Sequence, residues 1–144
     1  MRLVIITGNS LRHMYLVQEV EKHLDVVKVV AEEKFDYKKA FESSEFSETV
    51  NQHFNLRSEK ESKYFEKAAP DSQIIHLKKG EVNSMEWVEE LKSLEVDGIL
   101  LFGSSIIKEP LLKAYENRVI NLHLGLSPYY RGSGTNFWPV VDHR

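Results

Sequence analysis

The run Leu3–Thr7 constrains the fold of this chain more than any other segment. It reads Leu-Val-Ile-Ile-Thr, which is continuously apolar and largely β-branched. A strand with one face in water alternates polar and apolar residues, whereas a parallel strand covered on both faces is apolar throughout. The run is therefore predicted to be a central parallel strand. Because it stops at Gly8, it is too short for a signal peptide core or a membrane span.

Strand and helix patterns alternate after this run. Strands are predicted at Val26–Ala31, Ile74–Leu77, Gly98–Phe102 and Val119–His123, and helices over 10–24, at Met85–Leu94, at Pro110–Tyr115 and beginning at Trp138–Val141. Pro110 suits the first position of its helix, because its missing N–H would have no helical partner there. Alternation of this kind is typical of a doubly wound α/β sheet with helices on both faces.

Residues 33–69 interrupt the alternation. The segment is highly charged and yet carries large aromatic side chains along its whole length. Flexible linkers lack that many large apolar groups, so a helical insertion is predicted here. His53 and Arg57 lie four residues apart and would share one face of this helix. A solvated, charged face is favoured there over a lid that covers a ligand.

Composition limits the class of protein. The chain has 144 residues, the length of one domain, with a net charge of −3 and no cysteine. Without cysteine there is no disulfide framework, thiolate chemistry or cysteine–zinc site. No basic stripe favours a nucleic-acid-binding face, and no run approaches the roughly 20 apolar residues of a membrane span. No spacing of His, Asp and Glu indicates a metal site, and we expect a cytoplasmic protein.

Asn121 and His123 are the strongest candidates for chemistry. On a strand they would point to the same face, at the carboxyl end where open α/β sheets bind ligands. An amide donor beside an imidazole suits an oxyanion site, and His can also move a proton near neutral pH. In the alternative interpretation, Asn121 caps the following turn and His123 bonds a backbone carbonyl. The loop 127–134, with its Pro, Gly, Arg and two Tyr, favours the site.

The segment Asn121–Gly132 resembles the signature of the formyltransferase catalytic domain. Methionyl-tRNA formyltransferase, glycinamide ribonucleotide transformylase and the sugar N-formyltransferases belong to that family. Its motif runs Asn-x-His, two residues, Leu-x-Pro and a few residues to Gly, as it does here. The resemblance implies a Rossmann-like, mostly parallel sheet and 10-formyltetrahydrofolate as the formyl donor. It also implies that Asn121 and His123 stabilise the tetrahedral oxyanion.

The resemblance further implies two binding regions. The folate-binding residues would be Phe102, Gly103, Ser104, Ser105, Ile106, Ile107, Leu126 and Pro128. The acceptor-binding residues would be Gly8, Asn9, Ser10, Arg12, Arg131 and Gly132. Amides at a helix N-terminus favour an anion, so a phosphate of the acceptor is one expected ligand of the Gly8–Ser10 turn. An ordinary N-cap with a solvated Arg12 is the equal alternative.

By the same resemblance, residues 1–144 are an N-terminal catalytic domain that is incomplete at its C-terminal end. The family's third catalytic residue, an Asp, would fall beyond Arg144, which puts the activity of these 144 residues alone in question. The Arg131-Gly132 pair resembles the tRNA and amino-sugar branches, and the charge does not favour tRNA. The expected acceptor is the primary amine of a small molecule such as a nucleotide-linked amino sugar.

Three alternatives to that function stay open. They are a formyltetrahydrofolate hydrolase (deformylase), a methionyl-tRNA formyltransferase and a non-catalytic folate-binding module. The hydrolase would release formate without an amine, and the binding module would hold folate without turnover. A homodimer is an assembly that the resemblance allows.

Overall fold

The computed structural model describes residues 1–33, 36–132, 135 and 137–143. Its elements are β1 (Arg2–Gly8), α1 (Leu11–Glu21), β2 (Asp25–Glu32), α2 (Tyr37–Ala40), α3 (Ser47–Phe65), β3 (Ile74–Leu77), the 3₁₀ turn η1 (Glu81–Asn83), α4 (Met85–Ser93), β4 (Gly98–Phe102), α5 (Leu111–Ala114), β5 (Val119–Asn121) and α6 (Trp138–Val141). The described strands form one sheet in the order β3-β2-β1-β4-β5, and every pair is parallel.

Strand β1 lies in the middle of the sheet, as its apolar sequence predicts. Ile5 is opposite Val29 of β2 on one side and Leu100 of β4 on the other. Residues 3–8 are all buried. Each fully buried aliphatic side chain of this kind contributes about 1.5–3 kcal/mol relative to an exposed one.

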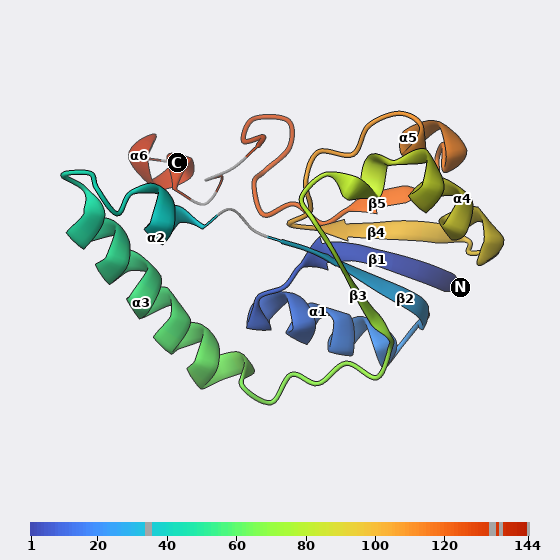
Figure 1. The fold of residues 1–144 in the computed structure, drawn as a ribbon, viewed down its shortest axis with the longest axis horizontal. Helices are drawn as coiled ribbons and strands as arrows, with labels where there is room; N and C mark the ends of the chain where they lie inside the picture. The colour runs from blue at the N-terminus through green and yellow to red at the C-terminus, as the bar shows by residue number, and fades with distance from the viewer. Residues whose placement is uncertain (34–35, 133–134, 136, 144) are drawn as a thin grey trace.

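Helices cover both faces of the sheet, which confirms the doubly wound, Rossmann-like fold (Figure 1). On one face Ile5 packs with Val17 of α1. On the other face the core is larger and is formed with α4 and α5 by Val4, Ile6, Val30, Val82, Trp87, Val88, Leu91, Val96, Ile99, Leu101, Leu111 and Tyr115. The helices at 85–94 and 110–115 are confirmed to within a residue or two, with Pro110 at the N-cap position rather than inside α5.

The segment between β2 and β3 is a helical insertion, as predicted, with residues 34 and 35 outside the described part. Its long helix α3 packs against α1 and α2. Near the end of α3, Phe65 contacts Tyr15 of α1 with ring centroids 5.0 Å apart. The Glu21 carboxylate accepts hydrogen bonds from the backbone N–H groups of Asp71 and Ser72, both at 2.9 Å, and so fixes the return to β3. Figure 1 shows α2 and α3 on the side to which the strands point.

The prediction of a strand at Val119–His123 needs a correction, because β5 ends at Asn121. The N–H of Leu122 still donates to Leu101 O at 2.8 Å, but the chain then leaves the sheet. His123 is held instead by the loop that follows, as described below. The predicted helix start at Trp138–Val141 is confirmed as α6. Among the described residues, no helix combines the length and apolar character needed to cross a membrane.

Candidate active site

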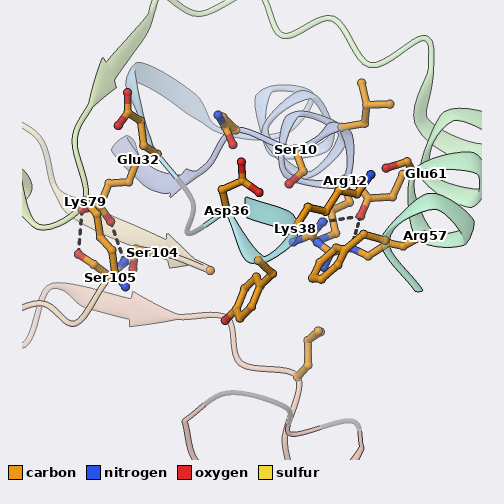
Figure 2. A pocket seen from close by; sticks show the side chains of 18 of the residues that line it. Ser10, Arg12, Glu32, Asp36, Lys38, Arg57, Glu61, Lys79, Ser104 and Ser105 are labelled. Carbon is orange, nitrogen blue, oxygen red and sulfur yellow. Dashed lines mark hydrogen bonds and ion pairs between the residues drawn. The ribbon is translucent and has the colours of Figure 1, made fainter. Parts of the chain in front are cut away.

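A pocket of about 1130 Å³ lies where the strands end (Figure 2). It lies between the start of α1, the inserted helices α2 and α3, and the loop after β4. The described residues that line it are Asn9, Ser10, Leu11, Arg12, Glu32, Glu33, Asp36, Tyr37, Lys38, Phe54, Arg57, Ser58, Glu61, Ser62, Lys79, Gly103, Ser104, Ser105, Leu124 and Thr135. The position agrees with the rule that open α/β sheets bind ligands beyond the carboxyl ends of their strands.

Glu32, the last residue of β2, organises one end of this pocket. The residue is only 1% exposed, yet its carboxylate accepts three hydrogen bonds. The donors are Gly80 N at 2.8 Å, Ser105 N at 2.6 Å and Ser105 Oγ at 2.8 Å. A buried carboxylate is tolerated when such donors satisfy it. Glu32 therefore ties the loop after β4 to the turn before η1, and the sequence analysis did not identify it.

Asn83 holds the same loop from its other side. Its Nδ2 donates to Ile106 O at 3.1 Å, and its Oδ1 accepts from Lys108 N at 2.7 Å. Gly103 begins the loop with φ of 65°, a left-handed conformation that glycine adopts without strain. The loop is thus fixed by the framework at both ends. A signal in the sequence for Glu32 was available, since it is the first carboxylate after the apolar run Val29–Ala31.

The structure divides the predicted folate-binding residues of this loop. Gly103, Ser104 and Ser105 line the pocket. Phe102 is half-buried and packs edge-on against His13, with centroids 5.2 Å apart, while Ile107 packs into the core beneath. Ile106 is 79% exposed and is not among the described lining residues.

The start of α1 forms a second wall of the pocket. Asn9 and Ser10 line it, whereas Gly8 is buried at the end of β1. Ser10 is the N-cap of α1, as predicted, and its backbone N–H donates to Nδ1 of His13 at 3.2 Å. His13 is itself buried at 2% exposure.

Arg12 and Arg57 meet at the far end of the pocket (Figure 2). Both bind Oε1 of Glu61, Arg57 through Nε at 2.8 Å. The solvated Arg12 of the equal alternative is therefore wrong, because helix α3 brings a carboxylate to it. Arg57 lines the pocket although its side chain is still 39% exposed, so this part of the charged helix face is both partly solvated and a wall of the pocket. The i,i+4 spacing of Arg57 and Glu61 was readable in the sequence, but the position of α1 beside them was not.

Burial sets the charge balance of this cluster. Desolvation and the charge of Arg57 lower the pKa of Arg12, and Glu61 offsets only part of that effect. Burial by itself would raise the pKa of Glu61, but the hydrogen bond from Arg57 and the charge of Arg12 outweigh it, so this pKa is lowered. Both pKa values are lowered, but this favours the charged form of Glu61, which faces two cations, and disfavours that of Arg12, which is desolvated and faces one cation as well as one anion.

Asn121 and His123 lie outside the described lining of the pocket. Asn121 is exposed and His123 is half-buried. His123 Nε2 lies 3.0 Å from Tyr130 O, and since a carbonyl only accepts, this nitrogen carries the donated proton. The alternative interpretation, in which His123 bonds a backbone carbonyl, is therefore what the structure shows for its Nε2. The next residue, Leu124, lines the pocket.

The loop after His123 folds back tightly on itself. A Cβ at Gly125 would lie 2.4 Å from Tyr130 O and 2.6 Å from the Cβ of Thr135, so only glycine fits. Thr135 in turn lines the pocket. This close approach places the Asn121–His123 segment beside the pocket and gives a physical reason for the glycine at position 125.

The remaining predicted site residues stay apart from the pocket. Leu126 is 69% exposed, and its carbonyl accepts hydrogen bonds from the N–H groups of Tyr129 and Tyr130, both at 3.0 Å. The other three are exposed as well and are absent from the described lining, namely Pro128, Arg131 and Gly132. In the part of the chain that the structure describes, no group of three or more His, Cys, Asp or Glu side chains could hold a metal ion.

Comparisons with known proteins agree with this fold. The fold is similar to glycinamide ribonucleotide transformylase 1 from Symbiobacterium toebii (TM-score 0.60, 14% identity), with all of this chain and 61% of that chain covered. Phosphoribosylglycinamide formyltransferase from Anaplasma phagocytophilum gives a TM-score of 0.63 at 14% identity, with coverage of 100% and 59%. The Bacillus halodurans enzyme of that name gives 0.62 at 17%, with coverage of 100% and 66%.

The chain thus spans about three fifths of the length of the first two of these structures. Among curated proteins, none matches the chain in sequence. The family model described as formyl transferase matches residues 1–139. On that match, and with a Rossmann-like sheet whose strand ends carry the pocket, the chain belongs to the formyl transferase family.

Proposed function

We propose that this chain is the catalytic domain of a formyltransferase that moves a formyl group from 10-formyltetrahydrofolate to the primary amine of a small acceptor. The observation that supports this most directly is the loop Gly103–Ser105, which the buried Glu32 fixes at the rim of a pocket in a formyl transferase fold. That loop exposes backbone and small side chains, which suits a planar, hydrogen-bonding pterin ring.

The reaction joins the acceptor nitrogen to the formyl carbon. The amine attacks this carbon, the carbonyl becomes a tetrahedral oxyanion, and the bond from carbon to N10 of the folate breaks. One proton moves from the attacking nitrogen to N10, so charge and atoms balance. Asn121 would donate a hydrogen bond to the oxyanion, where a preorganised donor is worth about 2.7–4 kcal/mol of barrier.

His123 would serve as the proton-handling group beside Asn121. Tyr130 O fixes its Nε2–H and so orients the ring. Nδ1 is then the nitrogen with a lone pair in the neutral imidazole, and it is the atom that can accept a proton. A fixed tautomer of this kind is what a general base requires.

The acceptor would enter from the side of α1 and α3. This part of the pocket is polar and carries charges of both signs. We propose a nucleotide-linked amino sugar as the acceptor class, since it presents an amine together with phosphate groups. Release of formate from the donor in the absence of any amine would instead indicate the hydrolase.

The proposal is tested first by binding, because binding requires the pocket rather than the complete catalytic machinery. The stable analogue 5-formyltetrahydrofolate is titrated into the unaltered chain and into Ser104→Trp, which fills the pocket at the loop. Ser93→Trp, at the end of α4, is the matched control. We expect saturable binding that Ser104→Trp weakens at least about tenfold and that Ser93→Trp leaves unchanged.

Turnover then separates catalysis from binding. Asn121→Ala is expected to bind 5-formyltetrahydrofolate normally and to lose about 10²–10³ in kcat with an amine acceptor. Folded protein that binds no folate, or that binds it equally well with Trp at position 104, would contradict the proposed donor site. Unchanged kcat in Asn121→Ala would contradict the role of the motif.

A further inference from the structure

The inserted helix α3 contributes a charge cluster that the proposed chemistry does not use. Arg12 and Arg57 share one carboxylate oxygen of Glu61, and in the described part of the chain this oxygen accepts all the hydrogen bonds that the two arginine side chains donate. The side chains of Arg12 and Arg57 are 29% and 39% exposed, and that of Glu61 is 14% exposed. Two cations and one anion therefore leave one net positive charge in a partly desolvated place.

The two guanidinium groups repel each other across Glu61. Burial and the charge of Arg57 together lower the pKa of Arg12, and Glu61 compensates only in part. A further anion would relieve this repulsion. Each guanidinium has five N–H donors in a planar fork that matches phosphate and carboxylate oxygens, and its bond to Glu61 uses one of them.

Aromatic packing fixes the direction of Arg57. Its guanidinium carbon lies 5.7 Å from the ring centroid of Phe54. Phe54 stacks on Tyr37 of α2, with centroids 5.4 Å apart and an interplanar angle of 16°. All three residues line the pocket. A preorganised cation on a rigid wall is better suited to ligand binding than one on a flexible surface side chain.

The two ends of the pocket have different chemistry. In Figure 2, Ser104 and Ser105 lie at one end, and Arg12, Arg57 and Glu61 lie at the other. A ligand that spans the pocket would thus meet the fixed loop with one part and the arginine pair with another. The bonds to Glu61 use one N–H donor of each guanidinium, and the remaining donors of the pair suit the three acceptor oxygens of a phosphate ester better than the two oxygens of a carboxylate.

We infer that Arg12 and Arg57 bind a phosphate group, that Glu61 is their internal counter-ion, and that the inserted helix α3 thereby selects a phosphorylated acceptor. The inference rests on the proposed function only in making the acceptor the bearer of this phosphate. It assigns to the insertion a role in substrate choice. It also means that Glu61 weakens phosphate binding, whereas its two arginine partners strengthen it.

Inorganic phosphate titrated by calorimetry into the chain tests the inference. We expect Arg57→Gln and Arg12→Gln each to weaken phosphate binding about tenfold or more, since each loses charged hydrogen bonds. Glu61→Gln is expected to tighten it about fivefold, because a neighbouring negative charge is removed. Lys60→Gln makes the same charge change as the arginine variants on an exposed part of the same helix, and is expected to have no effect.

The arginine variants are expected to weaken phosphate binding and Glu61→Gln to tighten it. A variant that merely damages the fold cannot bind phosphate more tightly, so misfolding cannot produce this pattern. No saturable phosphate binding by the unaltered chain, equal binding by Arg57→Gln, or weaker binding by Glu61→Gln would each overturn the inference. Acetate that binds as tightly as phosphate would overturn the assignment to phosphate.

A parallel titration with 5-formyltetrahydrofolate separates this inference from the proposed function. Phosphate binding with the expected signs, in a chain that binds no folate, would count against formyl transfer and leave the arginine pair standing. Folate binding without phosphate binding would count against the arginine pair as a phosphate site and leave formyl transfer standing.

Discussion

The two ends of the pocket each centre on a glutamate, but the two carboxylates are held in different ways. Glu32 is 1% exposed and, among the described residues, accepts only from neutral N–H and O–H groups, which belong to the Gly80 turn and the Ser105 loop. Glu61 is more exposed and binds two guanidinium groups, one on its own helix and one on α1. The first carboxylate belongs to the framework, and the second connects the insertion to that framework.

This difference means that the partners of Glu32 are fixed, whereas the partners of Glu61 can bind another anion. Neutral donors around a buried carboxylate are fixed by the backbone and cannot leave without exposing unsatisfied groups. Charged partners at the surface are screened and can exchange one anion for another. We therefore expect changes at the Glu32 end to affect folding, and changes at the Glu61 end to affect ligand binding with little effect on folding.

The largest expected effect is that of Glu32→Ala. The change leaves Gly80 N, Ser105 N and the Ser105 hydroxyl without their acceptor, and we expect a loss of about 2–4 kcal/mol in the free energy of unfolding. Urea unfolding monitored by circular dichroism measures this value. Glu33→Ala, at the exposed neighbouring residue, is the control and should stay within about 0.5 kcal/mol. Equal losses in the two variants would remove the distinction between the two ends.

Gly125→Ala is expected to have the next largest effect. Its new methyl group would lie within 2.6 Å of both Tyr130 O and the Cβ of Thr135, and overpacking of this kind costs about 1–3 kcal/mol. The same unfolding measurement applies. Gly132→Ala is a useful comparison, because Gly132 has open space around it and a φ of 82°, so that only backbone strain of about 1 kcal/mol is expected. A smaller loss at Gly125 than at Gly132 would show that the loop relaxes.

The smallest expected effect is the pH-dependent contribution of Glu61. Because its folded-state pKa is lowered, its stabilisation is present above the ordinary glutamate pKa and is lost as pH falls through the lower folded value. Glu61→Gln should thus reduce stability by about 0.5–1 kcal/mol at pH 7, and by almost nothing in strong acid. Unfolding free energies of both proteins from pH 7 downward measure the difference. A constant difference across this range would show that Glu61 acts through packing rather than charge.

The sequence predicted the sheet better than the site. Strand β1 and the helix α4 follow from periodicity and burial, which are local properties of the chain. The site depends on which loops meet, and this is set by the strand order, which brings Glu32 to Ser105 although 73 positions separate them. The predicted strand that would place Asn121 and His123 on one face was wrong at its last two residues. It ends at Asn121, and His123 bonds Tyr130 O in the following loop instead of continuing the sheet.

The helical insertion has a consequence for the entropy of the unfolded chain. Strands β2 and β3 are parallel neighbours, and the connection between them runs from Glu33 to Gln73. Loop-closure entropy grows only logarithmically with length, so each doubling of such a connection costs roughly 0.6 kcal/mol. A long insertion at this position therefore adds little loop-closure free energy to the cost of folding the sheet. This sheet can accept a new wall for its pocket at β2–β3 without rebuilding its core.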